Sequence, residues 1–266
     1  MYGDLERPPL DGRYLSGRLV RPGSLWTRID VLAETPSTNA DVAKAAADGA
    51  AEGLVVITEY QSAGRGRLGR TWTTPPRSAL LMSALLRPTA VDPGQLAWLG
   101  LLVPLAVATA VRDVAQVPAQ VKWPNDVLVE DRKLAGILLE RVDGPAVVVG
   151  MGLNVTLRES EKPHPAATSL ALENAATTDR VTIAAAILRE LEKRYRSWLQ
   201  DPSGLRDEYR ELSATLGQAV RVELPDGTFL EGTARDLAED GRLIVDTPDG
   251  ERLLAAGDVT HLRTSS

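Results

Sequence analysis

The segment GRGRLGR, residues 64–70, decides which fold this chain can have. Its glycines match the G-x-G-x-x-G pattern of dinucleotide-binding folds, which requires a following helix and an acidic residue about 20 positions further on. Here TWTTPP, residues 71–76, follows instead, and Ser83, Ala84 and Leu85 lie where the acidic residue belongs. Because β-branched residues and prolines oppose a helix, a Rossmann fold is excluded.

Two other glycine-loop folds are excluded as well. A protein kinase would carry HRD and DFG segments further along the chain, and neither is found. A nucleotide-binding P-loop would read G-x-x-x-x-G-K-[ST], and no such segment is present.

The same segment carries three arginines separated by glycines: Arg65, Arg67 and Arg70. The planar guanidinium group suits phosphate and carboxylate oxygens, and glycine lets the backbone approach a ligand closely. We therefore expect an anion-binding loop. A solvated basic turn and a nucleic-acid contact are the alternatives.

Composition narrows the class of protein further. The chain has 266 residues, of which 44% are apolar and 25% charged, which is typical of a soluble globular protein. The net charge of −6 opposes non-specific binding to nucleic acids. With no cysteine, disulfides, thiolate metal sites and thiol nucleophiles are all excluded. His164 and His261 lie too far apart in sequence to suggest a metal pair.

No segment predicts export or membrane insertion. Met1–Val20 contains acidic residues and prolines where a signal peptide would be apolar. The most apolar run, Leu99–Val111, is too short to span a bilayer. We expect a cytoplasmic protein.

The chain divides into three parts that differ in residue composition and in the pattern of apolar residues. Residues 1–24 are rich in Pro, Gly and Arg and are expected to be an irregular lead-in. Residues 25–216 alternate apolar strands with helices and predict a mixed α/β catalytic domain. Residues 217–266 form short strands joined by Asp-Gly turns and predict a small β-barrel.

Periodicity places the main elements of the catalytic domain. We expect strands at 54–58, 78–86, 119–122, 127–129, 134–141 and 146–149, and helices at 39–48, 95–113, 182–199 and 203–216.

The segment KWPND, residues 122–126, provides one cation and one carboxylate at a strand end. Pro124 favours an extended conformation at Trp123, which makes the turn rigid. Asn125 or Asp126 could then hold Mg²⁺ on phosphates, because magnesium prefers one or two protein oxygens together with phosphate oxygens and water. The alternative is an ordinary turn.

Two further segments have both a structural and a functional interpretation. Lys133 begins a strand that contains Gly136, which suits close approach of a ligand or an ordinary hairpin. Ser37, Thr38 and Asn39 begin a helix, where they would act as caps or bind a polar heterocycle.

Taken in order, these motifs resemble biotin–protein ligase. The resemblance covers about residues 30 to 265 and rests on five segments: E-x-x-STN at 34–39, EYQ-x-x-GRGR-x-x-R-x-W at 59–72, KWPND at 122–126, K-x-x-GIL-x-E at 133–140 and G-x-G-x-NV at 150–155. It implies an α+β fold with a class II synthetase-like mixed or antiparallel sheet flanked by helices, and a small C-terminal SH3-like β-barrel.

The resemblance also implies a reaction in two steps. Biotin and ATP give biotinyl-5′-AMP and pyrophosphate, and a lysine of a biotin carboxyl carrier domain then accepts the biotinyl group. Mg²⁺ is the implied cofactor, with Asp126 as its ligand. Some relatives carry an N-terminal DNA-binding domain, but too few residues precede Ser37 here, so we expect a monofunctional enzyme that binds neither DNA nor a membrane. A lipoate–protein ligase is the nearest alternative enzyme.

Site residues follow from the same motifs. The implied biotin-binding residues are Ser37, Thr38, Asn39, Gln61, Arg65, Gly66, Arg67, Lys133 and Gly136. The implied ATP- and adenylate-binding residues are Arg65, Arg67, Arg70, Trp72, Lys122, Asn125, Asp126, Asn154 and Ala167. Lys133, Arg67 and Arg70 are the expected catalytic residues. We also expect residues 64–74 and 158–168 to become ordered when the adenylate binds.

Overall fold

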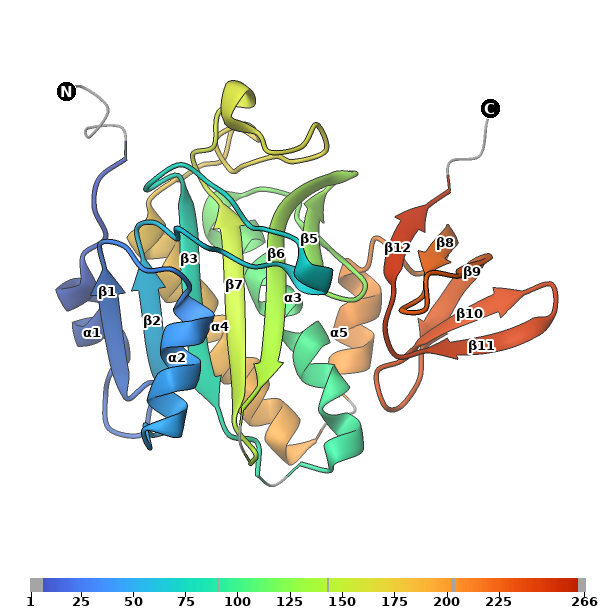
Figure 1. Ribbon diagram of the computed structural model, residues 1–266, viewed down its shortest axis with the longest axis horizontal. Coiled ribbons are helices and arrows are strands. Elements are labelled where there is room, and N and C mark those ends of the chain that lie inside the picture. The colour runs from blue at the N-terminus through green and yellow to red at the C-terminus, as the bar shows by residue number, and fades with distance from the viewer. Residues whose placement is uncertain (1–6, 90, 143, 202–203, 263–266) are drawn as a thin grey trace.

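A computed structural model describes residues 7–89, 91–142, 144–201 and 204–262. It contains a seven-stranded mixed sheet with helices on both faces, followed by a separate five-stranded antiparallel sheet (Figure 1). The predicted α+β class, with a mixed sheet flanked by helices, is confirmed.

The large sheet has the strand order β1-β2-β3-β7-β6-β5-β4. Only β1 and β2 run parallel, and every other neighbouring pair is antiparallel. The strands are β1 Arg28–Leu32, β2 Leu54–Thr58, β3 Ala79–Leu86, β4 Gln120–Lys122, β5 Asp126–Val129, β6 Arg132–Arg141 and β7 Val147–Asn154.

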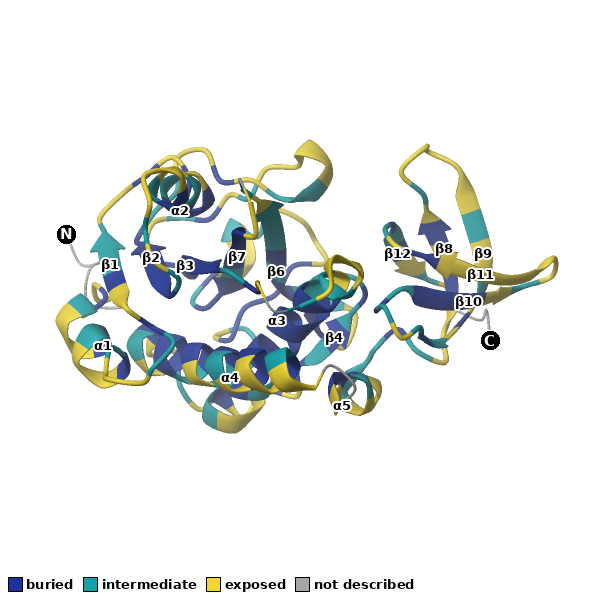
Figure 2. Ribbon diagram, turned by 90° about the horizontal axis from the view of Figure 1, so that it is seen from below, coloured by how far each residue is buried: buried dark blue, intermediate teal, exposed yellow. Residues whose placement is uncertain are grey.

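Helices cover the two faces unequally (Figure 2). Helix α2, Thr38–Ala47, packs on one face against β2, β3 and β7. Helices α3, Ala97–Ala110, and α4, Arg180–Gln200, pack together on the other face, and α5, Gly204–Leu212, lies beside them. Because both faces are covered, all five residues of β2 are buried. Leu54 and Val56 belong to the core under α2, whereas Val55 and Ile57 belong to the larger core opposite.

The helix expected at 182–199 is present as α4, two residues longer at its start and one at its end. It has an apolar stripe that is buried: Ile183, Ile187, Leu188, Leu191, Tyr195 and Trp198. The expected start of the next helix, Ser203, lies outside the described residues.

Helix α3 belongs to the continuous helical run Pro93–Ala115, which is longer than the apolar run that the sequence indicated. By length and composition alone this run could cross a membrane. Most of it is buried against the sheet and α4, which is how a core helix of a folded domain packs.

The expectation of an irregular segment before residue 25 is wrong for helix α1, Gly12–Leu19. Asp11 caps it by accepting a hydrogen bond from the backbone N–H of Tyr14 at 2.9 Å, and Leu15 and Leu19 are buried one turn apart. Gly12 is needed for packing, because a Cβ there would lie 2.8 Å from Cγ2 of Val31. Strand β1, which follows, was not expected either.

The second sheet has the order β11-β10-β9-β8-β12. Its strands are β8 Ala219–Glu223, β9 Phe229–Leu237, β10 Leu243–Thr247, β11 Gly250–Leu254 and β12 Asp258–His261. The ladders traced through residues 204–262 do not join β11 to β12, and closure into a barrel stays a prediction.

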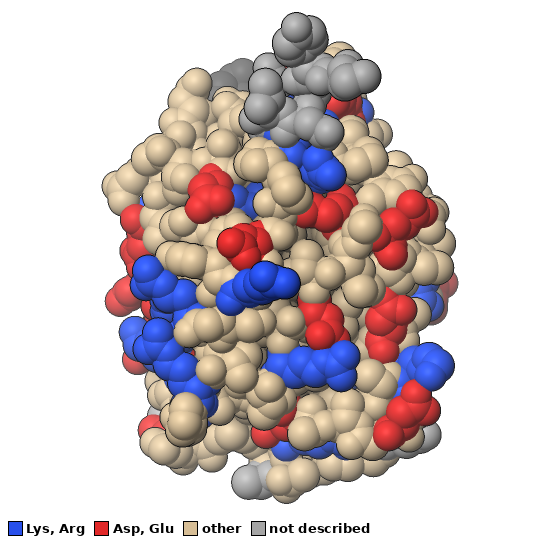
Figure 3. Space-filling view, turned by 90° about the vertical axis from the view of Figure 1, so that its left-hand side faces the viewer, with Lys and Arg blue, Asp and Glu red and all other residues tan. Residues whose placement is uncertain are grey.

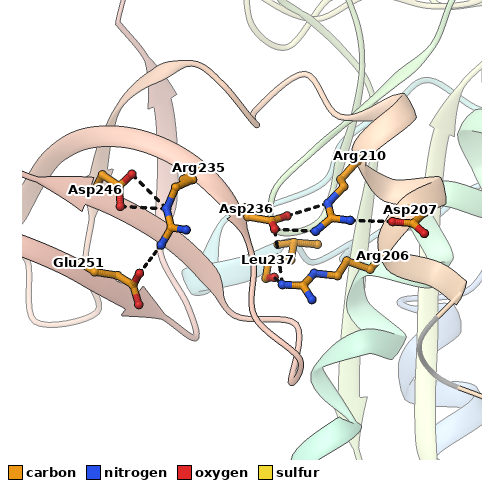
Figure 4. Close-up of polar contacts among 8 residues, drawn as sticks. All are labelled: Arg206, Asp207, Arg210, Arg235, Asp236, Leu237, Asp246 and Glu251. Atoms are coloured by element: carbon orange, nitrogen blue, oxygen red, sulfur yellow. Dashed lines mark hydrogen bonds and ion pairs between the residues drawn. The ribbon is translucent and has the colours of Figure 1, made fainter.

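Polar contacts attach this second sheet to the first domain (Figure 4). The guanidinium of Arg210 in α5 lies 2.6 Å from the carboxylate of Asp236 in β9, and Arg206 donates to the carbonyl oxygen of Leu237. Trp98 of α3 donates from its indole nitrogen to the carbonyl oxygen of Glu239 at 2.8 Å. These contacts hold β12 beside the large sheet, next to the site described below.

Candidate functional site

Two adjoining cavities lie against β6 and β7. The first, of about 140 Å³, is bounded by the start of α2, the loop 64–72 and both strands. The second, of about 840 Å³, extends toward β12 and the loop that contains His164. Six residues line both cavities and mark their junction: Arg70, Thr71, Trp72, Asp126, Lys133 and Asp258.

The structure brings together every residue that the sequence assigned to a site. All nine expected biotin-binding residues line the first cavity. Lys122, Asn154 and Ala167, expected at the nucleotide, line the second cavity only. The binding roles of all these residues stay predictions.

Two amide side chains at the polar end of the first cavity have fixed orientations. Asn39 donates from Nδ2 to the carboxylate of Glu140 at 2.6 Å and to the carbonyl oxygen of Leu138 at 3.3 Å, so its Oδ1 faces the other way. Oε1 of Gln61 accepts from the backbone N–H of Thr38 at 2.9 Å. The oxygens of both amides therefore point toward the hydroxyl groups between them.

The hydroxyl groups of Thr38 and Ser83 do not supply a proton for every oxygen–oxygen contact at this end of the cavity. Oγ of Ser83 lies 2.6 Å from Oδ1 of Asn39 and 2.7 Å from Oγ1 of Thr38, which in turn lies 3.0 Å from Oε1 of Gln61. Three oxygen–oxygen contacts therefore share only two hydroxyl protons. This end of the cavity has surplus acceptor capacity and suits a ligand that donates N–H groups.

Ser37 provides the complementary donor. As the N-cap of α2, its Oγ accepts from the backbone N–H of Ala40 at 3.4 Å. Among the residues that the structure describes, no acceptor is recorded for its hydroxyl proton, and the side chain lines the cavity. Ser37 can therefore donate to a ligand carbonyl oxygen while it caps the helix.

Three glycines of β6 and β7 make room for side chains that approach the sheet. A Cβ at Gly136 or Gly152 would lie 3.0 or 2.6 Å from the indole of Trp72, and one at Gly150 would lie 2.1 Å from Oδ1 of Asn39. Strand β7 runs through Gly150 and Gly152 to Asn154, beyond the end expected at 149. The indole nitrogen of Trp72 is buried, and within the described part of the chain it has no hydrogen-bond partner.

The glycine-arginine loop is a small hairpin. The N–H of Gly66 donates to the carbonyl oxygen of Arg70 at 2.7 Å, and that of Trp72 to the carbonyl oxygen of Gly64 at 2.9 Å. A single 3-10 turn, Arg67–Gly69, joins the two arms. The sequence prediction that these glycines do not open a Rossmann helix is confirmed.

Each of four cations at the site has a partner within the chain. Lys133 pairs with Asp126 at 2.7 Å, Arg70 with Asp258 at 2.5 Å, and Arg65 with Glu140 at 3.3 Å, while Arg67 donates to Oδ1 of Asn125 at 2.7 Å. Burial lowers the pKa of Arg67, and the hydrogen bond to Asp258 raises the pKa of Arg70. These partners occupy the donor groups that an incoming phosphate or carboxylate would use.

The second cavity is closed on one side by the loop that follows η4, Glu159–Glu161, drawn above β6 and β7 in Figure 1. The N–H of Lys133 donates to the carbonyl oxygen of Ala166 at 2.7 Å, and the N–H of Thr168 to that of Lys133 at 2.9 Å. Nδ2 of Asn154 donates to the carbonyl oxygen of Thr168 at 2.9 Å. Lys133 and Asn154 thus hold this loop against the site.

Both histidines of the chain line the second cavity, although they are far apart in sequence. Burial lowers the pKa of His261, and the positive charge of Lys122 lowers it further, against an opposite effect of Asp131. Within the described ranges, no group of three or more His, Cys, Asp or Glu side chains could hold a metal ion.

Of the residues at the site that were not assigned from the sequence, three make polar contacts with assigned residues: Ser83, Glu140 and Asp258. Ser83 is a buried hydroxyl in an otherwise apolar strand, a signal that could have been noticed. Glu140 ends a quoted motif but received no role. Asp258 comes from the second sheet, and nothing local in the sequence marks it, because its function depends on how that sheet docks.

Charge on the β1 side of the molecule is mixed. Figure 3 shows basic and acidic side chains intermingled on this face, without a continuous basic patch among the residues drawn in colour. This distribution does not favour binding of a nucleic-acid backbone on this face.

Comparisons with known proteins agree with this geometry. The Biotin/lipoate A/B protein ligase family matches residues 31–155, and the Biotin protein ligase C terminal domain matches residues 215–262. The chain is 46% identical over 264 residues to biotin--[acetyl-CoA-carboxylase] ligase of Mycobacterium tuberculosis, covering 98% of each chain. It is 30% identical to the bifunctional ligase/repressor BirA of Bacillus subtilis, covering 86% of this chain and 72% of that one.

A solved structure has the same fold. The biotin protein ligase from Aquifex aeolicus in complex with biotin and ATP superposes with a TM-score of 0.78 at 25% identity. The match covers 90% of this chain and 100% of the other, so both sheets of the present structure take part in it.

Proposed function

Because the chain belongs to the biotin/lipoate A/B protein ligase family, and within it to the biotin protein ligases, we propose that it biotinylates a carrier protein in two steps. The first step converts biotin and ATP to biotinyl-5′-AMP and pyrophosphate. The second transfers the biotinyl group to a lysine of a biotin carboxyl carrier domain. The name of the Mycobacterium tuberculosis relative supports acetyl-CoA carboxylase as the source of that domain. The proposed location of the reaction is the cytoplasm.

The surplus of acceptors at the polar end of the first cavity is the observation that carries this proposal. A ureido ring has two N–H donors and one carbonyl acceptor. The oxygens of Thr38, Asn39 and Gln61 can accept the N–H groups, and the hydroxyl of Ser37 can donate to the carbonyl oxygen. A dithiolane ring has no N–H donor and would leave one of the three oxygen–oxygen contacts without a proton, at a cost of about 1–3 kcal/mol. The arrangement therefore favours biotin over lipoate.

Lys133 is proposed to act in the first step. In this step the biotin carboxylate oxygen forms a bond to the α-phosphorus, and pyrophosphate leaves. Two negative groups about 4 Å apart repel by roughly 4 kcal/mol at an effective dielectric near 20. Lys133 lies at the junction of the two cavities, where it can leave Asp126 and bridge both anions. Arg67 and Arg70 would stabilise the developing charge on the phosphate oxygens.

Magnesium fits Asp126, which lines both cavities, together with Asn125, which lines the first. Mg²⁺ requires few protein oxygens when phosphates and water complete its shell, and Asp126 with Asn125 offers such a pair. Bound there on the phosphates, the ion would supply positive charge that weakens repulsion of the incoming carboxylate. When Lys133 turns to the substrate, Asp126 becomes available to the ion.

The second step requires a neutral lysine amine to attack the mixed anhydride while water is excluded. The hairpin 64–72 lines both cavities, and the loop around His164 lines the second. We propose that they close over the adenylate and protect it from hydrolysis. The amine displaces AMP, so no covalent enzyme intermediate is required.

The test is biotin-dependent exchange of labelled pyrophosphate into ATP, measured in parallel with biotin, lipoate and octanoate. Biotin should support exchange, and the two other acids should not. Transfer to a carrier domain is then followed by mass spectrometry of that domain. Exchange with lipoate but not biotin would contradict the proposal, and exchange without transfer would limit it to the first step.

A further inference from the structure

Glu140 touches two parts of the site, the polar end of the first cavity and the glycine-arginine hairpin. One carboxylate oxygen, Oε2, accepts from Nδ2 of Asn39 at 2.6 Å. The other, Oε1, lies 3.3 Å from Nη2 of Arg65. Glu140 itself does not line the first cavity; it lines a neighbouring space between β6 and the outer side of the glycine-arginine loop. It therefore acts through other residues.

On one side, Glu140 fixes the polar end of the cavity. Its contact with Nδ2 determines which atom of the Asn39 amide faces Ser83, and so it sets the direction of the hydrogen bonds that continue to Thr38. A ligand that donates to Oδ1 of Asn39 would polarise the amide. The Nδ2 donor then becomes stronger, and its bond to Glu140 tightens.

On the other side, Glu140 fixes the hairpin. Arg65 lies in its first arm and forms a backbone bridge with Thr71 in the second arm. The hydrogen bonds of Gly66 and Trp72 tie the arms together, so the segment 64–72 can move only as a unit. Holding Arg65 therefore also limits the positions of Arg67, Arg70 and Trp72.

We propose that Glu140 is a positioning residue that couples filling of the first cavity to closure of the glycine-arginine hairpin. Its carboxylate joins Asn39 to Arg65, so a ligand at the polar end of the cavity stabilises the closed hairpin. By thermodynamic linkage, the closed hairpin strengthens ligand binding by the same factor. This inference rests on the proposed function only in taking biotin as the ligand.

The variant Glu140→Gln separates the two contacts. Glutamine keeps one oxygen that can accept from Asn39, but its amide places N–H groups and no negative charge toward Arg65. Biotin should still bind, with an affinity reduced about fivefold, which corresponds to the loss of a partly exposed ion pair. In hydrogen–deuterium exchange, biotin should protect residues 64–72 of the wild-type enzyme but should no longer protect them in the variant.

A second variant keeps the inference testable if Glu140→Gln fails to fold. Arg65 has about half of its side chain exposed, so Arg65→Met should leave the fold intact. It should lose the same ligand-induced protection while the contact between Glu140 and Asn39 remains. The double variant should bind biotin no more weakly than the weaker single variant, because both changes remove one contact.

Glu208→Gln serves as the matched control. It removes a carboxylate that lies 3.0 Å from Arg194 at the α4–α5 contact, outside both cavities. Its biotin affinity and loop protection should equal those of the wild type. Effects of Glu140→Gln and Arg65→Met that multiply in the double variant, or full protection in either single variant, would overturn the coupling. If wild-type enzyme does not bind biotin at all, the proposed function fails instead.

Discussion

Lys133 combines three roles in a single residue. Its ammonium group pairs with Asp126, its backbone holds the loop at Ala166 and Thr168, and its side chain lies 5.9 Å from the centroid of the Trp72 ring. The backbone roles survive truncation of the side chain, and the charge does not. A mutation that shortens the side chain of Lys133 therefore tests its charge without changing its backbone contacts.

We expect Lys133→Ala to slow adenylate formation by about 10²–10³-fold, because the lost charge matters most as phosphate charge develops. Biotin binding should change little, since the ureido end of the cavity is intact. Pyrophosphate exchange gives the first quantity and calorimetry the second. Arg141→Ala, which removes an exposed cation from the far end of β6, is the control and should change neither. Equal losses in exchange and binding would argue against this role.

A buried ion pair between Arg180 and Glu59 holds the N-terminal segment in place. Arg180 donates to the carboxylate of Glu59 at 2.6 Å, and both side chains are more than nine-tenths buried. Glu59 also accepts from the N–H of Leu10, and Arg180 donates to the carbonyl oxygen of Pro8.

Arg180→Leu should reduce the free energy of unfolding by about 3–5 kcal/mol, because it leaves the Glu59 carboxylate buried without its counter-charge. Urea denaturation measures the loss. The double variant Glu59→Gln/Arg180→Leu should recover part of it, since no unpaired charge remains. A double variant that is less stable than Arg180→Leu would show that hydrogen bonding, and not the unpaired charge, dominates.

Strands β6 and β7 differ from ordinary core strands in their glycines. Gly136, Gly150 and Gly152 leave hollows that the indole of Trp72 and the amide of Asn39 fill. The flat, side-chain-free surface lets polar groups lie directly over the sheet. The site is therefore built on rigid strands as well as on loops.

Gly152→Ala places a Cβ 2.6 Å from the Trp72 ring and should displace the hairpin at a cost of about 1–3 kcal/mol. We expect pyrophosphate exchange to fall about 5- to 150-fold, by the same free energy. Thermal stability should change far less, because the hairpin is peripheral to the core. Gly100→Ala in α3 has nothing within 4 Å of the new Cβ and should stabilise the protein slightly. Unchanged exchange in Gly152→Ala would contradict this account of the glycines.

At the scale of helices and strands, the sequence predicted most of the elements that hydrophobic periodicity or a motif marks. Helix α4, the strand after the STN segment and the strands on both sides of the KWPND segment follow from local patterns. Helix α1 was missed because Gly12, which looks like a helix breaker, is required for contact with Val31. The contribution of Asp258 could not be predicted, since it depends on docking between two sheets that no local pattern encodes.

The second sheet contributes residues to the site, and their placement depends on how the whole sheet docks on the first domain. Its strand β12 supplies Asp258, Thr260 and His261 to the second cavity, and α5 fixes the sheet through Arg210 and Asp236. Hydrogen bonding to Arg210 holds the pKa of Asp236 below its usual value, so this contact persists at neutral pH.

Asp236→Ala should loosen that attachment and raise the KM for ATP about two- to fivefold, as expected for the loss of partly exposed ion pairs. Biotin affinity should stay constant, because the polar end of the first cavity belongs to the large sheet. Steady-state kinetics with each substrate varied in turn measures both. Asp246→Ala, which breaks the contact with Arg235 inside the second sheet (Figure 4), is the matched control. A rise in the KM for ATP in both variants would mean that sheet stability, not docking, is responsible.

The carboxylates that pair with Lys133, Arg65 and Arg70 have a consequence for how substrate binding responds to salt. Dissolved chloride normally surrounds free cationic sites and is released when a nucleotide binds, so affinity falls steeply with ionic strength. Here the protein supplies its own counter-ions to three cations, and nucleotide binding would replace a carboxylate of the protein with a phosphate of the ligand. Because few small ions are released, the affinity for ATP should vary only weakly with salt, although Arg65, Arg67, Arg70 and Lys133 all line the first cavity.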